Sequence, residues 1–220
     1  AIELDPAWGW SRAALALAHY RSLINGWSSD PTASIDALAG QANRAVQLDP
    51  QDPFGHHALG HALAFQGALR DGLHAFARGV ELGPNNAMAR GCYGMQLAAM
   101  READEALAQV EKAFELSPND PWQHRFALVR ARAHFAAERF PEAEKWALRS
   151  QQLRPSMGAF LHSVAAPALN NDVSRASARL SDAPFPALPE LVNVERNFKR
   201  STDSGYVDLL VSGLRSAGMR

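Results

Sequence analysis

The apolar positions of the chain recur as short helical stripes that come in pairs. After a turn at residues 66–67, four residues at spacings of four, three and four share one helical face: Leu69, Leu73, Phe76 and Val80. A shorter stripe, carried by Leu59, Gly60 and Leu63, precedes that turn, and the same pair of stripes returns after Pro84. This pattern predicts helical hairpins.

A recurring Leu-x-Pro motif sets the period of the hairpins. Its prolines are Pro6, Pro50, Pro84, Pro118 and Pro155. The two intervals between Pro50 and Pro118 are each 34 residues, the period of a known helix-turn-helix repeat. Each proline ends one helix and lets the next begin. We therefore predict full hairpins at 7–50, 51–84, 85–118 and 119–155, and a degenerate hairpin at 156–182.

Glycines stand at equivalent places in two of the hairpins. Gly60 and Gly94 lie in the first helix, where that helix is expected to cross the second. Glycine costs roughly 1 kcal/mol inside a helix, so its use there indicates a packing need. We expect both glycines to let neighbouring helix axes approach closely.

The two ends of the chain depart from the repeat. Residues 1–5 are interpreted as the tail of a second helix whose first helix is missing, which predicts that the chain is cut from a longer one. Residues 183–202 are predicted to be a proline-rich strap, and three prolines forbid a helix over residues 182–189. Residues 203–217 are predicted to form an amphipathic capping helix, because a solenoid must cover its last apolar face.

Together these positions resemble the tetratricopeptide repeat (TPR) family. Its pattern of Leu-Gly in the first helix, small and aromatic residues in the second and a closing proline is matched here by Leu59, Gly60, Leu63, Gly72, Phe76, Gly79 and Pro84. The resemblance covers residues 1 to about 182. It implies an all-α, right-handed superhelical solenoid of antiparallel helical hairpins, with a C-terminal strap and a capping helix.

A closer resemblance rests on three linked features. These are an expanded first unit that carries residues 26–28 and Asp30-Pro31, the proline-rich strap, and the ending at residues 213–218. Together they are similar to the C-terminal repeat region of bacterial class III adenylate or guanylate cyclases and of related winged-helix regulators. The resemblance implies an accessory region of a multidomain, cytoplasmic signalling protein. This segment would then have no enzymatic activity, while the intact protein could be a nucleotide cyclase.

The amino-acid composition limits the kinds of partner that the chain is expected to bind. The formal net charge is −1, so no global basic field attracts nucleic acid or anionic lipid. No apolar run of about 18 residues is present, so we expect no membrane partner. The single cysteine, Cys92, excludes an internal disulfide framework.

The sequence offers few candidate metal-ligating or catalytic residues. His57 and His61 are four residues apart, a spacing that can place two imidazoles on one metal ion. No third ligand lies nearby in the sequence, so we predict no metal site and interpret the two histidines as a polar pair lining a groove or as partly buried side chains. Cys92 is interpreted as a small core or groove residue, and we predict no catalytic residue and no cofactor.

In the TPR family the first helices of successive hairpins line a concave groove. The resemblance therefore implies a partner-binding surface made of Trp10, Leu17, Tyr20, Arg21, Phe54, His57, His61, Phe65, Met88, Met95, Arg125, Leu128, Arg132, Phe135 and His162. Aromatic residues, methionine and arginine are enriched at protein interfaces. We expect the groove to hold a protein or peptide, an upstream domain of the same chain, or a second copy of the chain. The alternative is that the C-terminal strap fills part of the groove.

Overall fold

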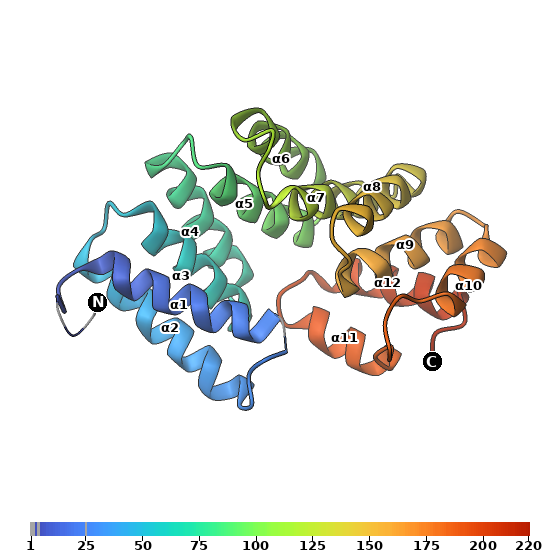
Figure 1. Ribbon diagram of the computed structural model, residues 1–220, viewed down its shortest axis with the longest axis horizontal. Helices are drawn as coiled ribbons and strands as arrows, with labels where there is room; N and C mark the ends of the chain where they lie inside the picture. Colours follow the sequence, from blue (N-terminus) through green and yellow to red (C-terminus); the bar gives the residue numbers. More distant parts are fainter. Residues whose placement is uncertain (1–2, 4, 25) are drawn as a thin grey trace. The chain divides into compact units, whose positions relative to one another are not determined.

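The computed structural model describes residues 3, 5–24 and 26–220 (Figure 1). Across this part of the chain the regular structure is helical, with no strand. The helices are α1 (Gly9–Ile24), α2 (Pro31–Leu48), α3 (Pro53–Phe65), α4 (Leu69–Leu82), α5 (Ala87–Ala99), α6 (Ala103–Leu116), α7 (Gln123–Ala136), α8 (Phe140–Leu153), α9 (Met157–Leu169), α10 (Val173–Ser181), α11 (Leu191–Lys199) and α12 (Ser204–Ser216). No helix in the described ranges is both long enough and apolar enough to cross a membrane. The helix tail expected at residues 1–5 falls mainly on residues 1, 2 and 4, which lie outside the described part.

The chain divides into two compact units, Ala1–Cys92 and Tyr93–Arg220, with the division inside α5. In the first unit α1 packs on α2, and α3 packs on both α2 and α4. The core between these helices is rich in alanine: Ala13, Ala16, Leu38, Ala39, Ala42, Ala45, Ala58 and Ala62. Small side chains at these positions let the helix axes come close together.

Proline and aspartate fix where two helices of the first unit begin. Asp30 accepts a hydrogen bond from the N–H of Ala33 and caps α2, while Asp52 accepts one from the N–H of Phe54 and caps α3. The residue after each aspartate is proline, whose missing N–H costs nothing in the first helical turn. These caps orient α3, which carries several of the predicted site residues.

Gly60 leaves room for a ring of the facing helix inside the second hairpin. A Cβ atom at Gly60 would lie 2.8 Å from ring atoms of Phe76 on α4, a distance that real Cβ contacts do not reach. Gly94 likewise leaves room in the second unit, where a Cβ atom would lie 3.1 Å from the carbonyl oxygen of Ala106. The predicted packing role of both glycines is confirmed.

In the second unit α7 packs on α6 and α8, and α9 packs on α8, α10 and α12. Buried Glu144 of α8 accepts a hydrogen bond from Arg179 of α10 at 2.9 Å and pairs with Arg175 at 3.4 Å. A Cβ atom at Gly213 of α12 would lie 2.8 Å from the carbonyl oxygen of Ala165 on α9. The C-terminal helix is therefore seated directly on the backbone of α9.

Residues 183–202 contain α11, a helix that the sequence pattern did not predict. The prolines of the strap end at Pro189, and the apolar residues that follow, Leu191, Val194 and Phe198, lie at helical spacings. Leu191 and Val194 are buried, and the N–H of Leu191 donates to the carbonyl oxygen of Arg220 at 2.7 Å. The strap is thus limited to the segment before α11.

Gly60→Ala should destabilise the first unit even though alanine is the better helix former. The added methyl group meets the buried Phe76 ring, and such overpacking costs about 1–3 kcal/mol, more than the roughly 1 kcal/mol gained in helix propensity. The matched control is Gly40→Ala in α2, where a Cβ atom meets nothing within 4 Å. In urea unfolding we expect a lower midpoint for Gly60→Ala and a gain of about 0.5–1 kcal/mol for Gly40→Ala. Equal gains for both variants would contradict the close approach.

Candidate functional site

An exposed aromatic cluster lies where α1 begins. We define the tryptophan cluster as Trp8, Trp10 and Phe54. The rings of Trp8 and Trp10 stack with centroids 5.2 Å apart, and Trp10 meets Phe54 of α3 edge-on at 6.4 Å. Trp8 and Trp10 remain 48% and 44% exposed. Two large aromatic side chains thus face solvent beside a third that is half-buried.

The first turn of α1 holds the tryptophan cluster in place. The carbonyl oxygen of Trp8 accepts hydrogen bonds from both the N–H and the hydroxyl of Ser11. Between the two tryptophans, Gly9 is buried, and a Cβ atom there would lie 3.1 Å from the carbonyl oxygen of Ala45. The backbone of α1 is therefore seated on α2, and both tryptophan rings are left on the outer side.

The other predicted groove residues of α1 follow the same helix. Leu17 and Tyr20 are half-buried and Arg21 is exposed. Tyr20 stacks on His61 with ring centroids 3.6 Å apart and meets Phe65 edge-on at 6.0 Å. The structure thus joins α1 to α3 through aromatic contacts at two places, Trp10–Phe54 and Tyr20–Phe65.

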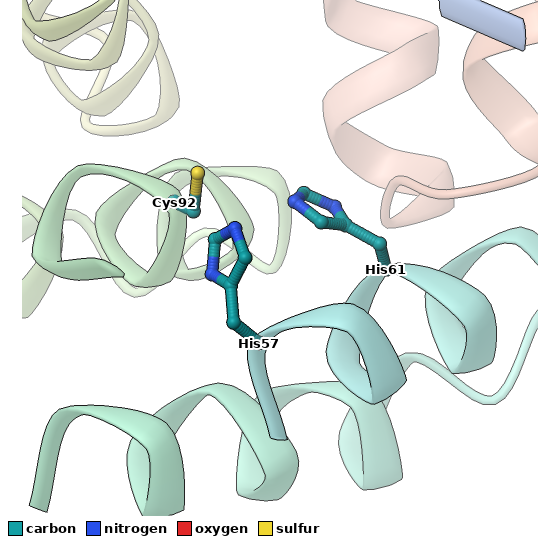
Figure 2. Close-up of side chains that lie close together, drawn as sticks. All are labelled: His57, His61 and Cys92. Carbon is teal, nitrogen blue, oxygen red and sulfur yellow. The ribbon is translucent and has the colours of Figure 1, made fainter. Parts of the chain in front are cut away.

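His57 and His61 are buried, with 5% and 8% of their surface exposed, so they do not line an open groove and are closer to the alternative of partly buried side chains. Their rings lie 4.9 Å apart at 84°, and both rings contact Phe76 of α4 edge-on. Cys92 of α5, which is half-buried, completes a group of three (Figure 2). The ligand atoms of His57, His61 and Cys92 all lie within 4.8 Å of one another. Sequence spacing alone did not show this juxtaposition, because Cys92 is on a different helix.

In the second unit the C-terminal helices cover the predicted surface. Phe135 and His162 are both 0% exposed, so they do not line an open groove, and their expected place there is wrong. Phe135 packs against Tyr206 of α12, with ring centroids 5.5 Å apart. The amphipathic pattern predicted the buried stripe of α12, but it carried no information about which helices that stripe covers.

His162 is part of a buried hydrogen-bonded pair. Its Nδ1 lies 2.7 Å from the carbonyl oxygen of Gly158 and its Nε2 lies 2.6 Å from the hydroxyl of Tyr206. A carbonyl oxygen can only accept, so Nδ1 carries the proton and Nε2 accepts from the Tyr206 hydroxyl. Burial, together with the positive charge of Arg132, lowers the pKa of His162 to about 3. Burial also raises the pKa of Tyr206, so both groups stay neutral at physiological pH.

Arg132 also contacts the C-terminal helices. Its guanidinium lies 5.3 Å from the centre of the Tyr206 ring and 5.6 Å from that of Phe198, and Nη1 donates to the sulfur of Met95 at 3.2 Å. The remaining predicted residues are half-buried: Met88 in the first unit, and Arg125 and Leu128 in the second.

Solved structures share this arrangement of helices. PilW, a type IV pilus biogenesis factor, matches with a TM-score of 0.67 at 15% identity over 95% of this chain and 88% of that one. A tetratricopeptide repeat protein of Parabacteroides merdae ATCC 43184 matches with a TM-score of 0.63 at 15% identity, over 100% and 83% of the two chains. YrrB, a TPR protein with an unusual peptide-binding site, matches with a TM-score of 0.52 at 17% identity, over 82% and 87%. The chain has the tetratricopeptide repeat fold.

Sequence comparison adds one weaker relation to this TPR chain. A protein of Rhizobium meliloti (strain 1021) that carries the name of an adenylate cyclase is 28% identical over 74 residues. The match covers 34% of this chain and 13% of that protein, so the chain spans a small part of its relative's length. No protein-family model matches the chain. The predicted fold class and the resemblance to TPR proteins are confirmed by the structural matches.

The buried histidine should make stability depend on pH. Unfolded His162 takes up a proton below its ordinary pKa of 6.5, whereas folded His162 stays neutral down to a pKa of about 3. The stability that this group contributes is therefore present above pH 6.5 and is lost as the pH falls toward 3, at up to about 1.4 kcal/mol per pH unit. Between pH 6.5 and 5 we expect the wild type to lose about 2 kcal/mol more than His162→Gln in urea unfolding. Identical pH dependence in both proteins would mean that His162 titrates normally.

Proposed function

We propose that this chain is a protein-interaction module whose partner-binding surface is on the first unit, centred on the tryptophan cluster. The observation that carries the proposal is the exposure of Trp8 and Trp10, stacked on each other and anchored beside Phe54. Large aromatic side chains are costly to leave in water and are enriched among the residues that dominate binding energy. Leu15, Ile24 and Trp27 extend the exposed apolar residues along the same N-terminal segment.

The residue pattern of α1 supports a continuous contact strip. Trp10, Leu17 and Arg21 are spaced by seven and four residues, so they share one helical face. The strip combines two apolar side chains with an exposed guanidinium, a composition typical of interface centres and rims. In the second unit, by contrast, Phe135 and His162 are covered by the chain itself.

The shared fold is compatible with a peptide or protein ligand. YrrB, one of the matching structures, is described as having a peptide-binding site, so this fold can present one. We infer a protein or peptide partner for this chain. An upstream domain of the same protein and a second copy of the chain are the other occupants to be distinguished.

Trp10→Ala should weaken partner capture without unfolding the protein, because the ring is nearly half exposed. Truncation of a central interface tryptophan typically costs about 2 kcal/mol or more, close to a thirtyfold loss of affinity. The measurement is quantitative affinity capture from a lysate of the source cells, with wild-type and variant baits at equal helicity by circular dichroism.

Val192→Ala is the matched control for that capture experiment, because Val192 is an apolar residue, 62% exposed, on α11 of the second unit. It should leave capture unchanged. Equal capture by the wild type and Trp10→Ala would overturn the proposed surface, and a loss with Val192→Ala would move the surface to the second unit. Sedimentation of the purified chain separately reports whether a second copy is the occupant.

A finer proposal is that the module is the accessory region of a multidomain bacterial signalling protein that acts in the cytoplasm. The match to the Rhizobium meliloti protein favours a nucleotide cyclase as the catalytic part. The module would then regulate or dimerise that cyclase; a winged-helix regulator is the alternative.

The coding sequence upstream of Ala1 distinguishes these two alternatives. Paired metal-binding aspartates are expected for a cyclase, and a winged-helix pattern for a transcriptional regulator. If a cyclase is present, Trp10→Ala in the full-length protein should alter cyclic nucleotide synthesis through the proposed surface. Unchanged cyclic nucleotide synthesis would mean that the tryptophan cluster does not regulate the cyclase.

A further inference from the structure

The group formed by His57, His61 and Cys92 combines ligand types that serve one class of metal ion. His57 and His61 are one helical turn apart on α3, so their side chains rise from the same face. Cys92 comes from α5, and Figure 2 shows both imidazole rings turned toward the helix that carries it. Two imidazole nitrogens and a sulfur thus converge from two helices within 4.8 Å.

We propose that His57, His61 and Cys92 bind one Zn²⁺ ion. Imidazole and thiolate are the preferred ligands of zinc, and two imidazoles with one thiolate give three of the four ligands of a tetrahedral site. Magnesium and calcium are bound by oxygen ligands, which this group of three does not supply. Three protein ligands leave a fourth coordination position for water or for a donor atom from a partner.

The observed spacing requires only a small contraction to fit the ion. With Zn–N distances near 2.1 Å and a Zn–S distance near 2.3 Å, neighbouring ligand atoms of a tetrahedral site are about 3.5 Å apart. The 4.8 Å limit of the group is therefore at most about 1.3 Å wider than the ligand spacing of a loaded site. We expect small rotations about the side-chain torsions of His57, His61 and Cys92 to supply this change.

Aromatic residues form a shell around the two histidines. Phe76 lies 4.9 Å from the ring of His61 and 5.7 Å from that of His57, and Tyr20 stacks on the ring of His61. Such apolar neighbours limit the access of water to the site. The ion would link α3 to the part of α5 that belongs to the first unit, so binding would also stabilise the folded first unit.

The decisive experiment is titration of the metal-free, reduced chain with Co²⁺, which replaces zinc and reports its ligands by absorption. We expect one ion per chain, a thiolate-to-cobalt charge-transfer band, d–d bands of tetrahedral intensity, and loss of these bands when Zn²⁺ is added. Cys92→Ser should abolish the charge-transfer band. His57→Ala and His61→Ala should each weaken Co²⁺ binding by more than about tenfold, since even an outer-shell partner is typically worth that much.

Two neighbouring histidines provide matched controls. His56 is adjacent to His57, but its Nε2 lies 2.9 Å from the carbonyl oxygen of Pro50, and His74 is exposed on α4. His56→Ala and His74→Ala should bind Co²⁺ like the wild type. Loss of binding in these variants, or a cobalt spectrum without the charge-transfer band, would show adventitious surface binding and overturn the proposal.

A second measurement covers the case in which a histidine variant does not fold. Cys92→Ser changes a single atom, so it should keep the wild-type helicity. Zn²⁺ should raise the melting temperature of the wild type and leave that of Cys92→Ser unchanged, because only an ion that binds the folded state stabilises it. An equal rise in both proteins, or no rise in the wild type, would mean that the three residues are packing residues only.

Discussion

Helix axes in both units come closest where a glycine or alanine leaves room for a neighbouring ring or backbone. Gly60 accepts the face of the Phe76 ring in the first unit, and Gly213 lies against the carbonyl group of Ala165 in the second. The alanine-rich core between α1, α2 and α3 extends the same principle. Other features depend on this close packing, because it fixes which side chains are covered and which remain outside.

Close packing also explains why some predicted binding residues are exposed in the first unit and others are buried in the second. In the first unit the contact between α1 and α2 is made by the small residues Gly9 and Ala45, which leaves the large rings of Trp8 and Trp10 outside. In the second unit α12 is drawn onto α9 by Gly213, and its Tyr206 covers Phe135 and His162. The same repeat pattern thus yields an exposed aromatic surface in one unit and a closed core in the other.

The sequence predicted the features that depend on local pattern. The 34-residue period and the equivalent glycines predicted the helical hairpins, because helix formation and hairpin packing are set by residues close together in the chain. The sequence did not predict which residue covers His162, because Tyr206 is 44 residues away and the apolar stripe of α12 is compatible with packing on several faces. The approach of Cys92 to the two histidines was missed for the same reason: the packing of α5 is a tertiary property. The helix α11 was missed because neighbouring prolines outweighed its short apolar pattern.

The bond between His162 and Tyr206 has a direction, because the Tyr206 hydroxyl donates to Nε2 while Nδ1 donates to Gly158. A slide of α12 along α9 by one turn, about 5.4 Å, would separate these two buried polar groups, and each would lose the other as its partner. Each would then cost about 1–3 kcal/mol, whereas an all-apolar contact would tolerate the slide more easily. This polar pair therefore fixes the register of α12 on α9 within a contact that is otherwise mostly apolar.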